Sequence, residues 1–467
     1  MLRRLFDSPW PYFIGAGLLL IVAIASQFEI RVPSRPEGQP ADIAALRERD
    51  DLNVVFIMID TLRSDRLGAY GYERPTSQTI DALASRGILF KNALTQSSWT
   101  KTSMASLWTS TYPVNNGIVR YNHVLPDEAV LPAELFKQAG YRTAGIWRNG
   151  WVAPNFGFGQ GFSFYLNPKP GSERQRLQSR KPGGRALKGT DEDLVVSALE
   201  FLDNFGREKF FLYLHFMDLH QYVYDEAAAR FGTSYSDVYD QAIHWTDRLI
   251  GHILNRVDEL GELSNTVVLI ASDHGEAFRE HGFEGHARNL YSEVVDVPII
   301  IALPFLLDPG IVVEERVSNI DIWPTLLDLV GLPPLVNADG RSLVPLILSS
   351  AGAGPSDDSF RRPVIAHLDR RWGSPKESEP VVSVTDGDLR LMWWVKRPKR
   401  TQLFNLAEDP AELKNLFRED DPTSQRLLEM ARQYYESGRS PWGVEPKEVE
   451  LDALRLNQLR ALGYVIR

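Results

Sequence analysis

The feature that most constrains the fold is a short apolar run that ends in residue types suited to binding a metal. Residues 265–291 read NTVVLIASDHGEAFREHGFEGHARNLY, and the apolar run at 267–271 is short enough to be a buried strand. Four polar residues follow within about one loop: Asp273, His274, His281 and His286. Ligands of open α/β sheets bind beyond the carboxyl ends of the strands. A carboxylate beside an imidazole suits a divalent cation, and a solvated polar loop is the alternative interpretation.

A second carboxylate follows a second apolar run. Asn53–Ile59 (NVVFIMI) predicts a buried parallel strand, and Asp60 comes directly after it. Farther along, Thr100 or Thr102 precedes a helix expected at 103–110, where unpaired N–H groups and the helix dipole favour an oxyanion. The alternatives are that Asp60 caps a turn and that the threonine is an ordinary helix N-cap.

Length and composition limit the classes of protein that fit. A chain of 467 residues accommodates one large α/β domain with a smaller one, or two to three ordinary domains. The net charge of −10 argues against nucleic acid as a partner. The chain has no cysteine, which excludes disulfides, thiolate metal sites and a cysteine nucleophile.

The N-terminal residues are expected to lie outside the folded body. Residues 9–28 carry no charge and are long enough to cross a bilayer as a single-pass anchor. Two arginines precede them, which predicts a cytoplasmic segment at 1–8 and a catalytic domain in the periplasm or outside the cell. The small residues at 23–25 leave a cleaved signal peptide as the alternative, and the length of the apolar run favours an uncleaved signal anchor. Residues 29–51 are then a tether.

Eight segments, taken together and in order, resemble the sulfatase family of the alkaline-phosphatase superfamily. They include NVVFIMIDTLRSDRLGAYGY, SMASLWTSTYPVNNGI, FLYLHFMDLHQY and SDHGEAFREHGFEGH. The segments lie at residues 53–72, 103–118, 211–222, 272–286, 296–304, 317–333, 339–347 and 403–416. Several independent motifs in family order are more specific than any one of them.

The resemblance implies both the fold class and the division of the chain. The fold would be α/β, with a large alkaline-phosphatase/sulfatase-like domain whose central mixed sheet is flanked by helices. A small C-terminal antiparallel sheet with a helix would follow it. We therefore expect a catalytic domain at 52–350 and a C-terminal subdomain at 356–467.

The resemblance also implies the active-site residues. Four residues match positions that bind one divalent metal ion in the family, with its identity (Ca, Mn, Mg or Zn) left open: Asp60, Thr100, Asp273 and His274. Thr100 matches the nucleophile. His220, in MDLHQY, matches a histidine near the charged oxygens of the substrate, and His286 matches a basic position that assists the leaving group.

Three further residues are predicted to bind the anionic ester: Lys101, Arg148 and Asn149. Lys101 would replace an arginine of the family motif, and the other two end a strand expected within 141–151. For Lys101 and Arg148 the alternative is an ordinary surface position. His215 is expected in the core or behind the ligands, and His281 is expected to be structural.

The chain departs from the family at the nucleophile. Sulfatases carry Cys or Ser there, in the motif C/S-x-P-x-R, and convert it to formylglycine, whereas residues 100–104 read TKTSM. Threonine cannot become formylglycine, and it occupies this position in phosphoethanolamine and phosphoglycerol transferases of the superfamily. Thr61 also stands where many sulfatases have Asp. Both departures favour phosphoryl chemistry.

Three functions remain open from the sequence. The favoured one is a metal-dependent hydrolase or transferase of phosphate or sulfate esters, with Thr100 forming a covalent intermediate. The alternatives are a sulfuric ester hydrolase that works without formylglycine and a catalytically silent binding protein with the sulfatase fold. The expected partners are an anionic ester (a glycan, a lipid headgroup or a small molecule) and a membrane through the N-terminal helix, with no nucleic acid.

Overall fold

The structure is a computed structural model that describes residues 35–168, 177–179, 189–226, 229–355, 358–374 and 376–450. The predicted anchor at 9–28 lies outside these residues. Within the described ranges, no helix combines the length and the apolar character needed to cross a membrane.

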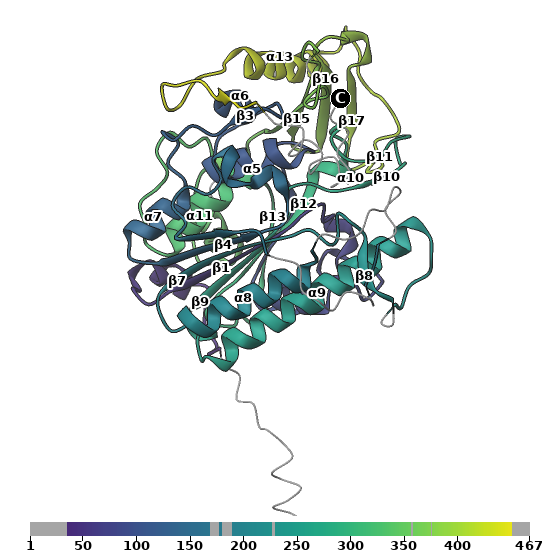
Figure 1. Cartoon of the computed structure of the whole chain (residues 1–467). Helices are drawn as coiled ribbons and strands as arrows, with labels where there is room; N and C mark the ends of the chain where they lie inside the picture. Colours follow the sequence, from purple (N-terminus) through teal and green to yellow (C-terminus); the bar gives the residue numbers. More distant parts are fainter. Residues whose placement is uncertain are drawn as a thin grey trace, which may run out of the picture.

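The core of the molecule is an eight-stranded mixed sheet with the order β13-β2-β12-β9-β1-β7-β4-β5 (Figure 1). Strands β9, β1, β7, β4 and β5 run parallel, and β12 is antiparallel to both of its neighbours. The strands are β1 Asn53–Ile59, β2 Ile88–Leu94, β4 Arg142–Trp147, β5 Phe164–Leu166, β7 Phe210–Phe216, β9 Thr266–Ala271, β12 Asp296–Ala302 and β13 Ile311–Ser318. The mixed central sheet predicted from the sequence is confirmed.

Helices cover both faces of this sheet, so its central strands are buried on two sides (Figure 1). Side chains alternate between the faces: Phe56 of β1 enters one core and Ile57 enters the other. One core is closed by α4 Gln78–Ser85, α8 Asp191–Phe205 and α9 Tyr235–Glu259. The other is closed by α3 Asp42–Ala45, α5 Thr100–Thr109, α7 Pro132–Gln138, α11 Ile322–Leu329 and α12 Val344–Ser350.

A second, four-stranded antiparallel sheet in the order β14-β15-β16-β17 follows the main sheet. Its strands are β14 Val364–Asp369, β15 Pro380–Asp386, β16 Leu389–Trp394 and β17 Gln402–Asn405, and α13 Pro422–Glu436 packs against it. We call the described residues 358–374 and 376–450 the C-terminal subdomain; it lies at one end of the molecule (Figure 1). The small antiparallel sheet is confirmed, whereas the boundaries 52–350 and 356–467 stay predictions.

Short elements complete the described fold. They include the helices α6 Pro113–Asn116 and α10 Ser292–Val295, several 3-10 helices, and three two-stranded pairs: β3 His123–Val124 with β18 Lys447–Glu448, β10 Ala277–Phe278 with β11 Glu284–Gly285, and β6 Leu177–Ser179 with β8 Val223–Asp225.

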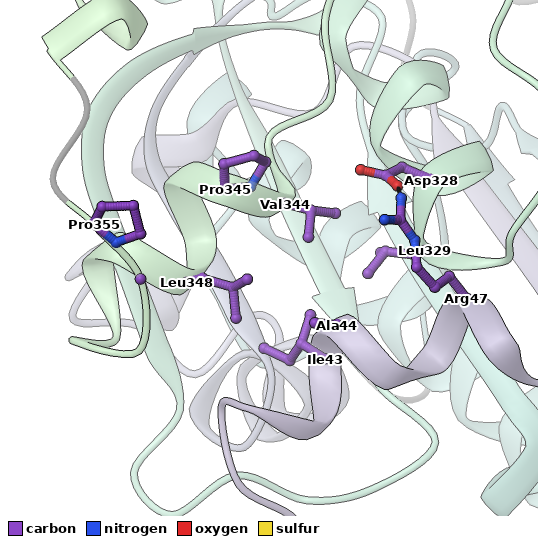
Figure 2. A pocket seen from close by; sticks show the side chains of 10 residues that line it. Ile43, Ala44, Arg47, Asp328, Leu329, Val344, Pro345, Leu348 and Pro355 are labelled. Atoms are coloured by element: carbon purple, nitrogen blue, oxygen red, sulfur yellow. Dashed lines mark hydrogen bonds and ion pairs between the residues drawn. The ribbon is translucent and has the colours of Figure 1, made fainter.

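A cavity of about 220 Å³ lies between α3, α11 and α12 (Figure 2). Ile43, Leu329 and Leu348 supply apolar walls, and the ion pair between Arg47 and Asp328 closes one side. Its lining includes none of the predicted site residues.

Candidate active site

The predicted metal ligands meet at the carboxyl end of two neighbouring parallel strands. Asp60 directly follows β1, and Asp273 comes two residues after β9, which pairs with β1. Ligand atoms of Asp60, Asp273 and His274 all lie within 4.8 Å of one another, and the three residues are completely buried. His274 lies near both carboxylates: its Nε2 is 3.4 Å from Asp273 Oδ2 and 4.0 Å from Asp60 Oδ1. We call these three residues the ligand cluster.

Thr100 reaches the ligand cluster from α5. Its Oγ1 lies 3.1 Å from His274 Nε2, and Ser103 of the same helix donates a 2.6 Å hydrogen bond to the carbonyl of Asp273. The helix begins at Thr100 because Trp99 before it is extended, and no side chain caps this end. The prediction that a threonine caps a helix starting at 103 is therefore wrong.

The ligand cluster fits a divalent cation. Asp60 Oδ1 and Asp273 Oδ2 are buried and accept no hydrogen bond from the described residues. Burial and the neighbouring Asp60 carboxylate raise the pKa of Asp273 well above its usual value. Burial also lowers the pKa of His274 to about 4, so its imidazole is neutral. Its Nδ1 faces the Gly275 carbonyl at 3.0 Å, which leaves the Nε2 lone pair for a metal.

Two further residues hold Asp60 from behind. His215 Nε2 lies 3.2 Å from Asp60 Oδ2, and Tyr213 holds the other ring nitrogen at 2.8 Å. Asn149 Nδ2 donates to Asp60 Oδ2 at 2.5 Å and to Thr100 Oγ1 at 3.3 Å. Asn149 was predicted to bind substrate, and the structure places its amide between the nucleophile position and a ligand. His215 lies behind the ligands, as the sequence predicts.

His220 and His286 flank the ligand cluster. The ring centroid of His286 lies 4.4 Å from that of His274 and 4.9 Å from that of His220, so three imidazoles converge. His286 Nδ1 faces Glu276 Oε2 at 3.2 Å. Sequence reasoning missed Glu276, although it lies three residues after Asp273 in the same motif. His281 points away: it stacks on Tyr291 with centroids 3.6 Å apart, which fits a structural role.

Lys101 and Arg148 are predicted to bind the anionic ester, and the structure turns both side chains to other partners. Lys101 is completely buried, donates a 2.7 Å hydrogen bond to the Tyr121 carbonyl and lies 3.5 Å from the centroid of the Phe156 ring. Successive helical residues differ by about 100° in direction, so Lys101 leaves α5 on another side than Thr100. Arg148 forms ion pairs with Asp191 and Asp218 instead.

Thr61 is strained by its position between β1 and the cluster. Its φ of +64° is rare for a β-branched residue. The conformation directs its N–H to Asp273 Oδ1 at 3.2 Å, while its hydroxyl donates to the Asp60 carbonyl at 2.6 Å. Tyr239 of α9 holds the Thr61 carbonyl at 2.6 Å. The Thr61 backbone thus holds the ligand Asp273, and the Thr61 hydroxyl is occupied by the Asp60 carbonyl.

Three tryptophan rings pack together next to the nucleophile position, two from the main domain and one from the C-terminal subdomain. Trp99 stacks on Trp372 of the C-terminal subdomain with centroids 4.4 Å apart and planes at 20°. Trp151 packs in a T-shaped arrangement against both rings, with its centroid 5.3 Å from that of Trp99 and 5.8 Å from that of Trp372. The residue before Thr100 is therefore held by a side chain from the other end of the chain.

Comparisons with known proteins match this chain to one family. The sulfatase family model matches residues 52–332, and the model for the C-terminal part of N-sulphoglucosamine sulphohydrolase matches 279–437. Rat steryl-sulfatase is 25% identical over 70% of this chain and 74% of its own length. Human arylsulfatase A is 27% identical over 78% of this chain and 83% of its own length.

A solved structure shares the fold. The phosphonate monoester hydrolase of Agrobacterium radiobacter superposes with a TM-score of 0.64, at 19% identity, over 86% of this chain and all of the other. The family model covers more than half of the chain. This protein therefore belongs to the sulfatase family and is an ester hydrolase of that family's kind.

Proposed function

We propose that this protein cleaves or transfers phosphate or sulfate esters with Thr100 as its nucleophile, and that phosphoryl chemistry is favoured. The observation that carries the proposal is the position of the Thr100 hydroxyl, 3.1 Å from Nε2 of His274 in the ligand cluster. Residue 100 is a threonine, so the nucleophile that this position offers is a hydroxyl.

Asp60, Thr100, Asp273 and His274 would hold one divalent ion. When bound, the ion neutralises charge on the ester and lowers the pKa of a coordinated hydroxyl. The donors comprise two carboxylates, one hydroxyl and one imidazole, with Thr61 turned to the backbone. Calcium prefers six to eight oxygen ligands, so we favour manganese or zinc over calcium.

The remaining residues are assigned to the transfer step. The Thr100 hydroxyl loses its proton to solvent, and its Oγ1 bonds to the phosphorus or sulfur atom while the bond to the leaving oxygen breaks. His286 gives a proton to that oxygen, and Glu276 orients its ring by holding Nδ1. His220 holds an oxygen of the transferred group, and the Asn149 amide holds Thr100 Oγ1 and Asp60 Oδ2 beside it. Water or an acceptor alcohol then attacks the Thr100 ester and frees the threonine.

The nature of residue 100 favours phosphate esters over sulfate esters. A formylglycine hydrate expels sulfate by collapsing to a carbonyl, whereas a sulfated threonine has to be displaced by another nucleophile. A phosphothreonine is the more workable intermediate. The sulfatase names of the relatives favour the second candidate, a sulfuric ester hydrolase without formylglycine. The intact ligand cluster argues against a silent binding protein, which has no need of buried carboxylate oxygens that accept no hydrogen bond from the described residues.

The location outside the cytoplasm and the membrane anchor are part of the proposal. They rest on the uncharged run at 9–28 and on the arginines before it. A glycan, a lipid headgroup or a small ester would then be the substrate on that side of the membrane.

One experiment tests the proposal. The full chain is purified in detergent, its metal content is measured, and aryl sulfate, phosphate monoester, phosphodiester and phosphonate ester are assayed with wild type, Thr100→Ala and Thr100→Ser. We expect activity in wild type, a partial loss in the serine variant and a complete loss in the alanine variant. Equal activity of the alanine variant would remove Thr100 as the nucleophile and leave the metal site standing. If metal-loaded wild type is inert on all four esters, the proposed ester-cleaving function is refuted.

A further inference from the structure

A buried group of three charges lies behind the proposed site. Arg148 Nη1 lies 2.8 Å from Asp191 Oδ1 and 2.5 Å from Asp218 Oδ1. The side chains of both aspartates are completely buried, and that of Arg148 is 7% exposed. We call these three residues the buried ion cluster. It joins the end of β4, the first residue of α8 and the end of β7.

The buried ion cluster fixes the turn that carries His220. The Asp191 carboxylate accepts hydrogen bonds from the backbone N–H groups of Met217 at 3.0 Å and Asp218 at 2.7 Å. Arg148 Nη2 donates to Gln221 Oε1 at 3.2 Å. The turn is therefore held immediately before and immediately after His220, which stands between Asp218 and Gln221 in the chain.

Arg148 also precedes Asn149, whose amide contacts Asp60 and Thr100. Because the Arg148 side chain is engaged on one side of the chain, the backbone leaves β4 in a fixed direction. The Asn149 amide is fixed in turn by the Trp151 N–H, which donates to Asn149 Oδ1 at 2.9 Å. His220, proposed to hold the transferred group, and Asn149, which contacts Thr100, thus both depend on Arg148.

Charge makes this arrangement depend on arginine. Two buried carboxylates face one guanidinium, and Trp245 Nε1 gives a further 3.0 Å hydrogen bond to Asp218. Burial and the Asp191 charge raise the pKa of Asp218 to about 7. Without Arg148, two buried carboxylates would face each other with no cation between them.

We propose that Arg148 is a positioning residue, which sets His220 and Asn149 around Thr100 from behind without touching the ester. The interpretation of its effect on turnover rests on the proposed function, whereas its effect on the placement of His220 does not. A positioning role can be distinguished from a direct substrate contact by which second substitution restores activity to an Arg148 variant. The substitution Asp218→Asn removes one buried negative charge and so compensates for a neutral residue at 148, whereas it cannot replace a lost contact to substrate.

The test uses the full-length protein with three variants, Arg148→Gln, Asp218→Asn and the double variant. We expect Arg148→Gln to lower kcat by about 10- to 100-fold with KM nearly unchanged, because misplaced catalytic groups slow the step more than binding. We expect the double variant to recover most of that loss. Arg142→Gln is the matched control, since Arg142 lies on the same strand and pairs with Glu208 at the exposed surface; it should change neither parameter.

Crystal structures of the same variants give a readout that needs no activity. In Arg148→Gln the His220 ring should move away from its 4.9 Å centroid distance to His286, and in the double variant it should return. If the His220 ring moves in this way but the wild type is inert on every ester, the positioning role of Arg148 is supported and the proposed function is refuted. An active wild type, with a raised KM in Arg148→Gln and no rescue by Asp218→Asn, would overturn the positioning role. If Arg148→Gln fails to fold, a folded double variant with wild-type kcat supports it, and a folded double variant with no activity overturns it.

Discussion

Asn149 donates from Nδ2 to Oδ2 of Asp60 at 2.5 Å, so one oxygen of this carboxylate is held by an amide while the other faces Asp273 and His274. His215 contacts the same held oxygen at 3.2 Å. The orientation of a proposed metal ligand is thus set by residues from two other strand ends.

Asn149→Ala should therefore weaken metal binding. Loss of a residue that orients a ligand lowers metal affinity by about 10- to 100-fold. Titration of the metal-depleted protein with manganese or zinc measures the change. Asn167→Ala is the control, because exposed Asn167 bonds only to the Trp147 carbonyl in the described contacts, at 2.9 Å. Equal affinities of wild type and Asn149→Ala would contradict the assignment of Asp60 as a ligand oriented by Asn149.

Metal removal should destabilise the protein through its two buried carboxylates. A ligand that binds only the folded state stabilises it in proportion to the logarithm of its concentration over Kd, so a chelator should lower the Tm of wild type. In Asp273→Asn the like-charge repulsion is gone, and we expect a Tm that the chelator barely changes. Thermal unfolding followed by circular dichroism provides the measurement. The same chelator-induced drop in both proteins would show that the ion binds elsewhere.

Buried Arg390 should be essential for stability. It joins the two sheets, with Nη2 at 2.7 Å from Asp296 and Nη1 at 3.3 Å from fully buried Glu412. Removing one partner of a buried ion pair costs about 3–5 kcal/mol, so Arg390→Met should lower the free energy of unfolding by that amount. Arg426→Met is the control, because its pair with Asp386 is exposed and should cost about 0–1 kcal/mol. Guanidinium unfolding distinguishes the two; similar losses would show that Arg390 is not a tie between the sheets.

His367 should make the protein sensitive to acid. Burial lowers its pKa to about 4, so the folded protein keeps His367 neutral while the unfolded chain protonates it. The unfolded state then binds more protons between about pH 6.5 and pH 4, and stability should fall by about 3 kcal/mol as the pH drops through this window. His367→Gln should lose correspondingly less over the same range, measured by denaturant unfolding at several pH values. Identical pH slopes for the two proteins would contradict this source of acid sensitivity.

The sequence predicts the ligand cluster well because sheet geometry determines it. Asp60 and Asp273 follow apolar runs that had to be buried strands, and parallel strands bring their carboxyl ends to one edge. The directions of Lys101 and Arg148 could not be predicted in this way. All ten residues of α5 are buried, although six of them are polar, so the sequence does not show which side of the helix Lys101 leaves. The partners of Arg148 lie 43 and 70 residues farther along the chain and share no local pattern with it.

The stacking of Trp372 on Trp99 has a consequence for how this protein can be rearranged. A gene truncated after the main sheet would encode a chain in which the residue before Thr100 has lost its covering ring. Chimeras that exchange the C-terminal subdomain between relatives would have to carry the matching tryptophan with it. We therefore expect the main sheet to need the C-terminal subdomain for activity.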